Sequence, residues 1–346
     1  MSVVAAVRTK VPDTIYSREE ITAQAREWLA SHPSEQTLFE RFLGSCQIAQ
    51  RPFVLPLHQI VELQGQESRA ELFQKFGRGL ALGAAEEALC NASASASEID
   101  ALIFSSCTCP LVPSMDTVLM NQLQLKPETL RVPMYQHGCV GGAVGLSLAH
   151  QFAQLGKTSL VAALEICSLG FRGDDLTGGN LVGSAIFADG AAGAIVSPRG
   201  AGLRIISTKS LLIPESEYLM GYDIRDDGSH LRLDKELPAQ LARCAKRALP
   251  DFLSENQLRP EDVMWWLIHP GGVRILELLR DEFNLRDEQL QFSWSVLNSY
   301  GNMSSASILF VLAEFMASGV VQAKEYAVGL GVGPGLTVQL ILFQRD

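Results

Sequence analysis

The sequence predicts an α/β protein, and three observations support that class. Segments with apolar residues at helical spacing alternate with short apolar segments typical of strands along almost the whole chain. Hydrophobic residues make up 47% of the 346 residues and charged residues only 19%, which favours much buried regular structure. No low-complexity linker interrupts the pattern. A chain of this length holds either two ordinary domains or one large duplicated unit.

The first two hundred residues are predicted to alternate long helices with buried strands. Residues 18–47 have the spacing of one or two amphipathic helices, and residues 72–92 that of another. Strands are expected at 101–105, 131–135 and 159–165. We further predict that 184–187 and 191–196 pair as a hairpin around the turn Ala188-Asp189-Gly190.

The same pattern begins again after Gly200. Helices are predicted at 238–253, from about 272, and at 302–318, and strands at 203–208, 263–268, 326–331 and 336–343. We therefore place a division near residue 200, with residues 1–200 as an N-terminal half and 201–346 as a C-terminal half. The repeated pattern points to an ancestral duplication.

The composition excludes several classes of function. The formal net charge of −10 and the lack of clustered Lys and Arg argue against nucleic-acid binding. The seven cysteines include no repeated CxxC pair, so we expect neither a disulfide framework nor a metal site. No apolar stretch is long enough for a signal peptide or a membrane span, so the reducing cytoplasm is the expected compartment.

Cys139 is the first candidate for chemistry, in the motif Gly-Cys-Val-Gly-Gly at 138–142. It lies where a predicted strand gives way to a helix, and exposed backbone N–H groups at a helix start lower the pKa of a thiol. A thiolate attacks a thioester carbonyl group well, and the residue's own amide can stabilise an oxyanion. The neighbouring glycines permit close approach of backbone and substrate. The alternative is a buried structural cysteine in a glycine-rich packing joint.

His269 and Asn302 are two further candidates. His269 follows the apolar strand 263–268 and precedes Pro-Gly-Gly, and strand ends display catalytic groups in α/β folds. Its imidazole can polarise a carbonyl group or stabilise a thiolate, whereas a capping or core histidine is the alternative. Asn302 opens a predicted helix, where it serves either as an N-cap or as an amide that donates hydrogen bonds to a thioester oxygen.

Together the motifs around these three residues resemble the three signature motifs of type III polyketide synthases, the chalcone synthase-like family, in their usual order. The motifs are Gly-Cys-Val-Gly-Gly, Ile-His-Pro-Gly-Gly and Tyr-Gly-Asn-Met-Ser-Ser. Further matches stand at 134–136, 171–173, 188–192 and 331–337, and the likeness spans about residues 35 to 345. The last match resembles the family's glycine-proline-glycine loop beside the active site, and it contains Gly333 and Pro334.

This resemblance implies a thiolase-like five-layered αβαβα fold built from two duplicated halves, and a homodimer. It also implies an acyltransferase that joins an acyl starter to malonyl-CoA by decarboxylative Claisen condensation and then cyclises the product to a pyrone or phenolic ring. Cys139 would hold the starter, while His269 and Asn302 bind the malonyl thioester and stabilise its enolate. The substrates would be CoA or phosphopantetheine thioesters, with no cofactor and no metal.

The resemblance also implies a set of pocket residues. Phe187 matches a gatekeeper aromatic residue between tunnel and cavity, with core packing as its alternative, and Leu231 stands where plant members have a second gatekeeper phenylalanine. The cavity positions that the family varies fall at Cys107, Thr108, Cys167, Gly170, Tyr222 and Ser304. Gly170 enlarges the cavity and Tyr222 fills part of it, so an aromatic starter of the chalcone kind is not expected. Cys107 resembles the residue of bacterial members that make phloroglucinol- or naphthalene-type products.

The thioester carrier and the reaction class both have alternatives. Plant members carry several basic residues on an N-terminal helix for the CoA phosphates; here Arg41 remains, while Gly44 and Ile48 take the other positions. The acyl group therefore arrives either on CoA or on an acyl carrier protein. The competing functions are a single-condensation ketosynthase of the ketoacyl-ACP synthase III type using carrier-bound substrates, a noncatalytic binding protein, and a cysteine hydrolase. The motifs Gly-Asn-Met-Ser-Ser and Gly-Pro-Gly-Leu-Thr favour the polyketide group.

Overall fold

A nine-stranded mixed sheet dominates the computed structural model, which describes residues 2–320 and 322–345. The strand order is β11-β12-β13-β8-β1-β7-β6-β4-β5. The bounds are β1 Val3–Lys10, β4 Ile99–Ser105, β5 Leu130–Met134, β6 Thr158–Ile166, β7 Asp189–Ser197, β8 Leu203–Leu212, β11 Val263–Ile268, β12 Tyr326–Gly333 and β13 Thr337–Arg345. Most central strands are continuously apolar, as expected for a sheet that helices cover on both faces.

The sheet consists of two blocks that meet at one end. β1 and β8 pair only through Val3 with Arg204 and Val4 with Leu203. One block is β1, β7, β6, β4 and β5, and the other is β8, β13, β12 and β11. All strands of the first block precede Gly200, and all strands of the second block follow it.

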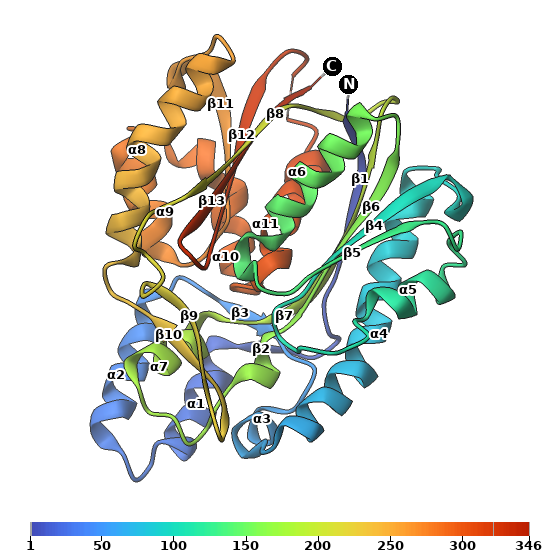
Figure 1. Ribbon diagram of the computed structural model, residues 1–346. Helices are drawn as coiled ribbons and strands as arrows, with labels where there is room; N and C mark the ends of the chain where they lie inside the picture. The colour runs from blue at the N-terminus through green and yellow to red at the C-terminus, as the bar shows by residue number, and fades with distance from the viewer. Residues whose placement is uncertain (1, 321, 346) are drawn as a thin grey trace.

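Helices form three layers around the two blocks (Figure 1). α6 (Gly141–Gln154) and α11 (Ser307–Ala317) lie in the middle and contact strands of both blocks. α4 (Gln66–Asn91) and α5 (Asp116–Gln122) cover one outer face, and α8 (Leu237–Glu255) and α9 (Val273–Glu282) cover the other. The five-layered order that the sequence predicted is therefore confirmed. None of the described helices is both long and apolar enough to span a membrane.

A group of smaller elements gathers at the lower end of the molecule in Figure 1. It contains α1 Arg18–Trp28, α2 Pro33–Ser45, α3 Leu57–Glu62, α7 Gly178–Ile186, the pair β2 Ile15–Ser17 and β3 Gln50–Pro52, and the pair β9 Met220–Arg225 and β10 Gly228–Leu233. α1 begins with a capping box between Ser17 and Glu20, which explains why the helix starts there. These elements provide most of the walls of the pocket described below.

The predicted hairpin at 184–187 and 191–196 is wrong, because the first segment belongs to helix α7. The hydroxyl group of Thr177 caps this helix by accepting a hydrogen bond from the backbone of Asn180. The predicted helix 302–318 is also shorter than expected. Asn302 pairs with Phe187 as an isolated bridge, a 3₁₀ turn follows at 304–306, and α11 begins only at Ser307.

Candidate active site

Cys139 lies in a short 3₁₀ helix, Gly138–Val140, that leads directly into the central helix α6. Its side chain is buried, with 6% of the residue exposed. Gly138 has a φ of +54°, and a Cβ atom there would lie 2.6 Å from Cδ of Pro334. A larger residue would therefore push the cysteine loop away from the loop that follows β12. A Cβ atom on Gly333, the last residue of β12, would lie 2.5 Å from the carbonyl oxygen of His137, so the end of β12 packs against the cysteine loop.

His269 is the first residue after β11, and it is 1% exposed. Its backbone N–H donates to the carbonyl group of Leu330 at 2.8 Å, which continues the pairing of β11 with β12 and fixes the backbone. Its Nδ1 atom is buried and has no hydrogen-bond partner among the described residues. An unpaired buried ring nitrogen is uncommon, and it points to a role beyond packing.

Asn302 is held by its backbone and by its side-chain oxygen. Its N–H donates to Ile186, and its carbonyl group accepts from Ala188, at 2.8 and 2.9 Å. Its Oδ1 accepts from the backbone N–H of Ser304 at 2.8 Å, and its Nδ2 lies 3.4 Å from the carbonyl oxygen of Gly271. The amide therefore directs its NH₂ group toward the segment that follows His269. The N-cap of α11 is Ala306, so the capping alternative for Asn302 is wrong.

A short chain of contacts joins the three candidate residues. The Ser304 side chain acts on the Cys139 thiol by lowering its pKa, and the backbone N–H of Ser304 donates to Oδ1 of Asn302 at 2.8 Å. Asn302 in turn approaches Gly271, where a Cβ atom would lie 3.5 Å from Nε2 of His269. Ser304 also places its Oγ 3.2 Å from Sγ of Cys107. These contacts link segments from three distant parts of the chain, which contain Cys139, His269 and Asn302.

Burial acts against the charged forms of both Cys139 and His269. It raises the pKa of the Cys139 thiol to about 12, although the bond from Ser304 acts in the opposite direction. It lowers the pKa of His269 to about 4. The expectation that the helix start lowers the pKa of Cys139 is therefore wrong, because burial outweighs it. Near neutral pH and without substrate, Cys139 is therefore a thiol and His269 a neutral imidazole.

Glu165 is a buried carboxyl group at the same site. It lies near the end of β6, and its two oxygens accept from the backbone N–H of Cys107 at 3.2 and 3.1 Å. Ser305 donates to it at 2.5 Å. Burial raises its pKa to about 7, so it titrates close to neutral pH. Glu165 thereby fixes the loop of Cys107 against the 3₁₀ turn that contains Ser304.

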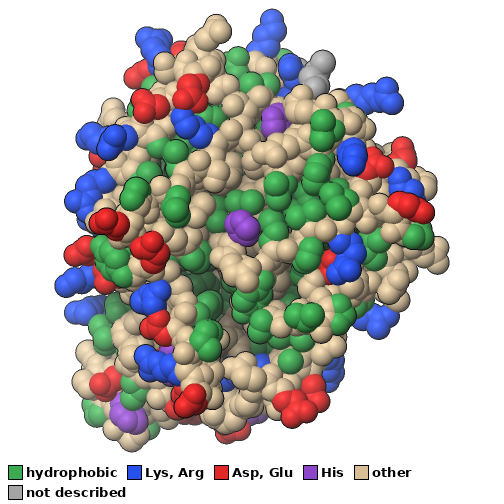
Figure 2. All heavy atoms as spheres, in the orientation of Figure 1, with side chains coloured by type: hydrophobic (Ala, Val, Ile, Leu, Met, Phe, Trp, Pro, Cys, Tyr) green, Lys and Arg blue, Asp and Glu red, His purple; other side chains and the backbone are tan. Residues whose placement is uncertain are grey.

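Half of the ten predicted pocket residues line one apolar pocket. Five of them do so: Phe187, Cys167, Gly170, Tyr222 and Leu231. The other walls come from α1, α2, α3 and α7, with residues that include Trp28, Phe39, Ile60 and Asn180. On the face shown in Figure 2, hydrophobic side chains gather around a hollow in the middle, while Lys, Arg, Asp and Glu lie mostly toward the periphery. The pocket suits an apolar chain better than a charged one.

A second, smaller pocket adjoins the first. Cys107 and Thr108 line it together with Gly170 and Tyr222, which line both pockets. Thr108 accepts the backbone N–H of Ile166 through its hydroxyl oxygen. Arg41 is exposed on α2 and lies outside the lining of both pockets. Seven of the ten predicted substrate residues thus line one or both of these pockets, whereas Ser304, Gly333, Pro334 and Arg41 line neither.

The family models for chalcone and stilbene synthases match most of the chain. The N-terminal domain model matches residues 56–200, and the C-terminal domain model matches residues 204–345. The chain belongs to this family. It is a type III polyketide synthase, which confirms the resemblance that the three sequence motifs indicated and favours this function over the ketoacyl-ACP synthase III alternative.

Named relatives of this polyketide synthase are bacterial. The chain is 31% identical to a 1,3,6,8-tetrahydroxynaphthalene synthase of Streptomyces coelicolor over 96% of this chain and 89% of the relative. It is 29% identical to a putative chalcone synthase of Bacillus subtilis, over 100% and 99% of the two chains. The crystal structure of the Streptomyces coelicolor synthase, described as a bacterial type III polyketide synthase, superimposes with a TM-score of 0.95 at 30% identity, over 99% of each chain.

Sequence reasoning missed two parts of this polyketide synthase. Glu165 was included in a buried strand without a role, although a carboxyl group in an otherwise apolar segment is itself a signal of a functional site. The hairpin of β9 and β10 was not predicted as strands, although Met220, Tyr222 and Ile224 alternate with other residues as in a half-buried strand. It contributes both Tyr222 and Leu231 to the pocket.

Proposed function

We propose that this type III polyketide synthase loads an acyl starter on Cys139 and extends it with malonyl-CoA by decarboxylative Claisen condensation. The observation that carries the proposal is the convergence of Cys139, His269 and Asn302 beside an apolar pocket. A nucleophile, a base and a non-titrating donor are the groups that this reaction requires. The product would be a cyclised polyketide, a pyrone or a phenolic ring.

In the loading step, the sulfur of Cys139 attacks the thioester carbonyl carbon of the starter while His269 takes the thiol proton. Because burial disfavours each charge alone, thiolate and imidazolium stabilise each other when they form together. The bond between the carbonyl carbon and the sulfur of CoA then breaks, and CoA leaves as a thiol with the proton from His269. The result is an acyl-Cys139 thioester.

In the extension step, Asn302 and His269 donate hydrogen bonds to the thioester oxygen of malonyl-CoA. The bond to the carboxylate carbon breaks, CO₂ leaves, and its electron pair forms an enolate whose oxygen these donors stabilise. The enolate carbon attacks the carbonyl carbon of acyl-Cys139. A carbon–carbon bond forms, the carbon–sulfur bond to Cys139 breaks, and Cys139 leaves as a thiolate, which takes a proton from water to restore the thiol. No metal or redox cofactor takes part in this scheme.

Incubation of the purified enzyme with malonyl-CoA and a panel of acyl-CoA and acyl-carrier starters tests the proposal. Mass spectrometry should detect products that are heavier than the starter by two or more C₂ units and that contain a ring. A single linear β-ketoacyl thioester would instead show the one-step condensation, and release of the free starter acid alone would show a hydrolase.

We also propose that CoA carries the malonyl extender and that Arg41 meets its phosphate groups. Arg41 is exposed on α2 and so is accessible to a soluble thioester. The Arg41→Ala variant should raise the KM for malonyl-CoA about threefold to tenfold with little change in kcat, as loss of an exposed phosphate contact does. Arg274→Ala, which removes an exposed arginine from α9, is the control; an equal effect in both variants would refute the role of Arg41.

We further propose a homodimer. Val112 is 98% exposed in the loop that begins at Cys107, and a large, fully exposed aliphatic side chain on a functional loop favours cover by a partner. Light scattering coupled to gel filtration should give twice the chain mass of 37.6 kDa. A monomer at micromolar concentration would contradict this proposal.

The proposed compartment is the cytoplasm, since all seven cysteines are free thiols in the structure. Fractionation of the producing cells tests this proposal. Detection of the chain in the membrane or secreted fraction would contradict it.

A further inference from the structure

The hairpin of β9 and β10 is a separate two-stranded sheet at the edge of the pocket. Leu231 pairs with Tyr222 in its register, and both side chains line the pocket. The outer part of the hairpin is exposed, with Ile224 at 77%. An isolated two-stranded hairpin is at best marginally stable in water. Its position over the pocket therefore depends on contacts with the rest of the molecule.

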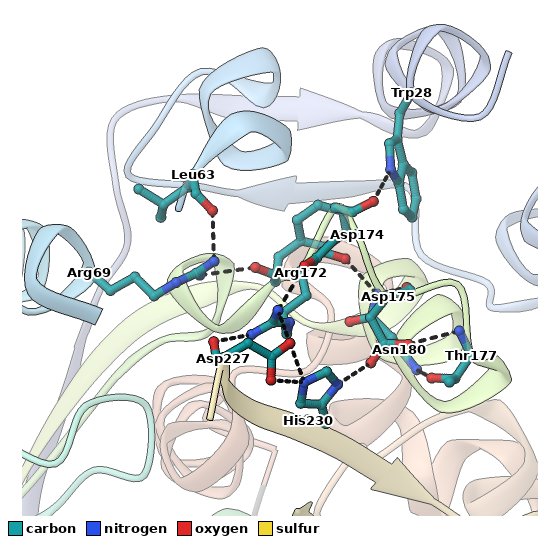
Figure 3. A network of polar contacts seen from close by, with 12 residues as sticks. Trp28, Leu63, Arg69, Arg172, Asp174, Asp175, Thr177, Asn180, Asp227 and His230 are labelled. Carbon is teal, nitrogen blue, oxygen red and sulfur yellow. Dashed lines mark hydrogen bonds and ion pairs between the residues drawn. The ribbon is translucent and has the colours of Figure 1, made fainter. Parts of the chain in front are cut away.

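His230, next to Leu231, provides the main polar contact of this hairpin (Figure 3). Its ring is buried, with Nδ1 2.8 Å from Oδ2 of Asp175 and Nε2 3.0 Å from Oδ1 of Asp227. Asp227 lies in the turn between β9 and β10, and Asp175 lies in the segment before α7. The ring of His230 thus joins the hairpin to a different part of the chain.

The charges of this cluster complement one another. Each ring nitrogen of His230 lies within hydrogen-bond distance of a carboxylate oxygen. The hydrogen bond with His230 lowers the pKa of Asp227. Arg172 brings a cation to the cluster: its guanidinium group donates to the backbone oxygen of Asp227 at 2.6 Å and to its carboxylate at 2.7 Å. Charge-assisted bonds of this kind are stronger than neutral ones.

The segment that receives the hairpin is itself fixed from three helices. Trp28 of α1 donates to the carbonyl group of Gly173 at 2.8 Å, and Arg69 of α4 donates to that of Phe171 at 2.9 Å. Asn180 of α7 donates to the carbonyl groups of Arg172 and Asp175 at 2.9 and 2.5 Å. Figure 3 shows these donors arranged around the segment. The bond to His230 therefore attaches a weak element to a rigid one.

The hairpin also approaches α7 closely. A Cβ atom on Gly183 would lie 2.3 Å from Cδ2 of Leu231 and 3.3 Å from the ring of Phe187. Leu231 therefore packs directly against α7 at Gly183 and also lines the pocket. A small shift of the hairpin moves Leu231 and Tyr222 relative to Phe187, and so changes the shape of the pocket.

We propose that His230, with Asp175, Asp227 and Arg172, determines starter specificity by fixing Tyr222 and Leu231 in the wall of the acyl pocket. This inference rests on the proposed function, in which the apolar pocket receives the acyl chain. His230 and Asp227 line neither pocket, so they act through the hairpin and not by contact with substrate. His230 is a positioning residue.

The test uses two variants that loosen the hairpin and two that should not. His230→Ala removes both bonds, and Asp227→Ala removes an exposed partner at little risk to folding. Asp175→Asn is the conservative variant, because its Oδ1 still accepts the N–H of Thr177 and its NH₂ group can donate to a neutral His230 ring. His58→Ala, which alters an exposed histidine of α3, is the matched control.

Two measurements separate this inference from the proposed function. Hydrogen–deuterium exchange of residues 220–233, without substrate, reports whether the hairpin is held. The ratio of kcat/KM for lauroyl-CoA to that for hexanoyl-CoA, with malonyl-CoA as extender, reports specificity. Decarboxylation of malonyl-CoA and alkylation of Cys139 report whether the catalytic centre is intact.

In His230→Ala and Asp227→Ala, we expect faster hydrogen–deuterium exchange at 220–233. The ratio of kcat/KM for the two starters should change by about fivefold or more. Malonyl-CoA decarboxylation and Cys139 alkylation should stay within about twofold of the wild type. Asp175→Asn and His58→Ala should match the wild type in every measurement. Unchanged exchange in His230→Ala, or faster exchange with an unchanged starter ratio, would overturn the inference. If the wild-type enzyme does not decarboxylate malonyl-CoA, the proposed function is refuted. The exchange data, which need no substrate, would still show whether His230 holds the hairpin in place.

Discussion

The catalytic centre and the β9–β10 hairpin are built in opposite ways. Cys139, His269 and Asn302 are almost wholly buried, and backbone pairing and the central helices hold them. Most residues of the hairpin strands are only half-buried, and a few polar side chains hold the hairpin. The chemistry therefore lies where dense packing prevents movement, whereas the residues proposed to select the substrate stand on an element that single substitutions can displace.

The largest effect is expected at the centre, from Cys139→Ala. Without the thiol, no acyl-enzyme forms, so the intact-protein mass should show no acyl adduct after incubation with an acyl-CoA, and product formation should fall by about a thousandfold or more. Cys90→Ala, which removes an exposed thiol, is the control. Acyl loading in the Cys139→Ala protein would place the nucleophile elsewhere.

Asn302→Asp tests the donor role without emptying the site. The carboxylate keeps an acceptor for the N–H of Ser304 but loses the NH₂ group. Decarboxylation of malonyl-CoA should fall by about a hundredfold to a thousandfold, the usual cost of a lost oxyanion donor, while acyl loading is largely retained. Release of ¹⁴CO₂ from carboxyl-labelled malonyl-CoA measures decarboxylation, and the intact-protein mass measures acyl loading. Equal losses in both steps would show instead that Asn302 is only structural.

Glu165→Gln tests how strongly burial acts at the centre. A carboxyl group whose pKa rises from 4.5 to about 7 on folding binds more protons in the folded state, so the wild-type protein loses stability as the pH rises through that range. The Glu165→Gln variant has no carboxyl group at this position, so it lacks this loss of stability with rising pH. From about pH 5 to pH 8, the free energy of unfolding should fall in both proteins or in the wild type alone. The fall should be larger in the wild type than in the variant by on the order of 3 kcal/mol. Urea titrations at both pH values check this, and parallel curves would contradict it.

His269→Gln tests the proposed pairing of thiolate and imidazolium. Removing the imidazole removes the charge that stabilises the thiolate, so the pH midpoint of Cys139 alkylation by iodoacetamide should move upward by about one unit or more. Peptide mapping of the alkylated cysteine at a series of pH values measures it. A midpoint that does not move would show that His269 and Cys139 do not share a proton.

Leu231→Phe should have the smallest effect, because it changes only the pocket. The larger ring has no space beside Gly183 and must turn toward the cavity. We expect use of lauroyl-CoA to fall about threefold to tenfold relative to hexanoyl-CoA, while decarboxylation of malonyl-CoA is unchanged. Steady-state kinetics with the two starters measure the ratio, and a uniform loss for both would contradict a role in selection.

The sequence predicted the fold class and brought out the three central residues, because motifs and apolar periodicity are local properties. Strand β11 was predicted with its bounds, and its six residues are a continuous apolar run. Helix α7 was not predicted, since three of its nine residues are glycines, which disfavour helices, and its start depends on the hydroxyl group of Thr177. The β9–β10 hairpin was not predicted either, because contacts between distant residues such as His230 and Asp175 fix its place.

The pKa of Cys139 shows the same limit at the level of one residue. The sequence places the thiol at the start of a helix, which favours the thiolate, but only the structure reveals that surrounding residues exclude it from water. The sign of the shift therefore came from tertiary packing and not from local position. Glu165 follows the same rule, since its partners Cys107 and Ser305 come from other parts of the chain.

The most direct single measurement is the mass of the peptide containing Cys139 after brief incubation of the wild-type enzyme with hexanoyl-CoA and then with malonyl-CoA. We predict a hexanoyl adduct on Cys139 that disappears after malonyl-CoA is added, together with release of CO₂ and of a ring-containing product extended by C₂ units. An adduct on another residue, or one that malonyl-CoA converts only to hexanoic acid, would contradict the proposed reaction.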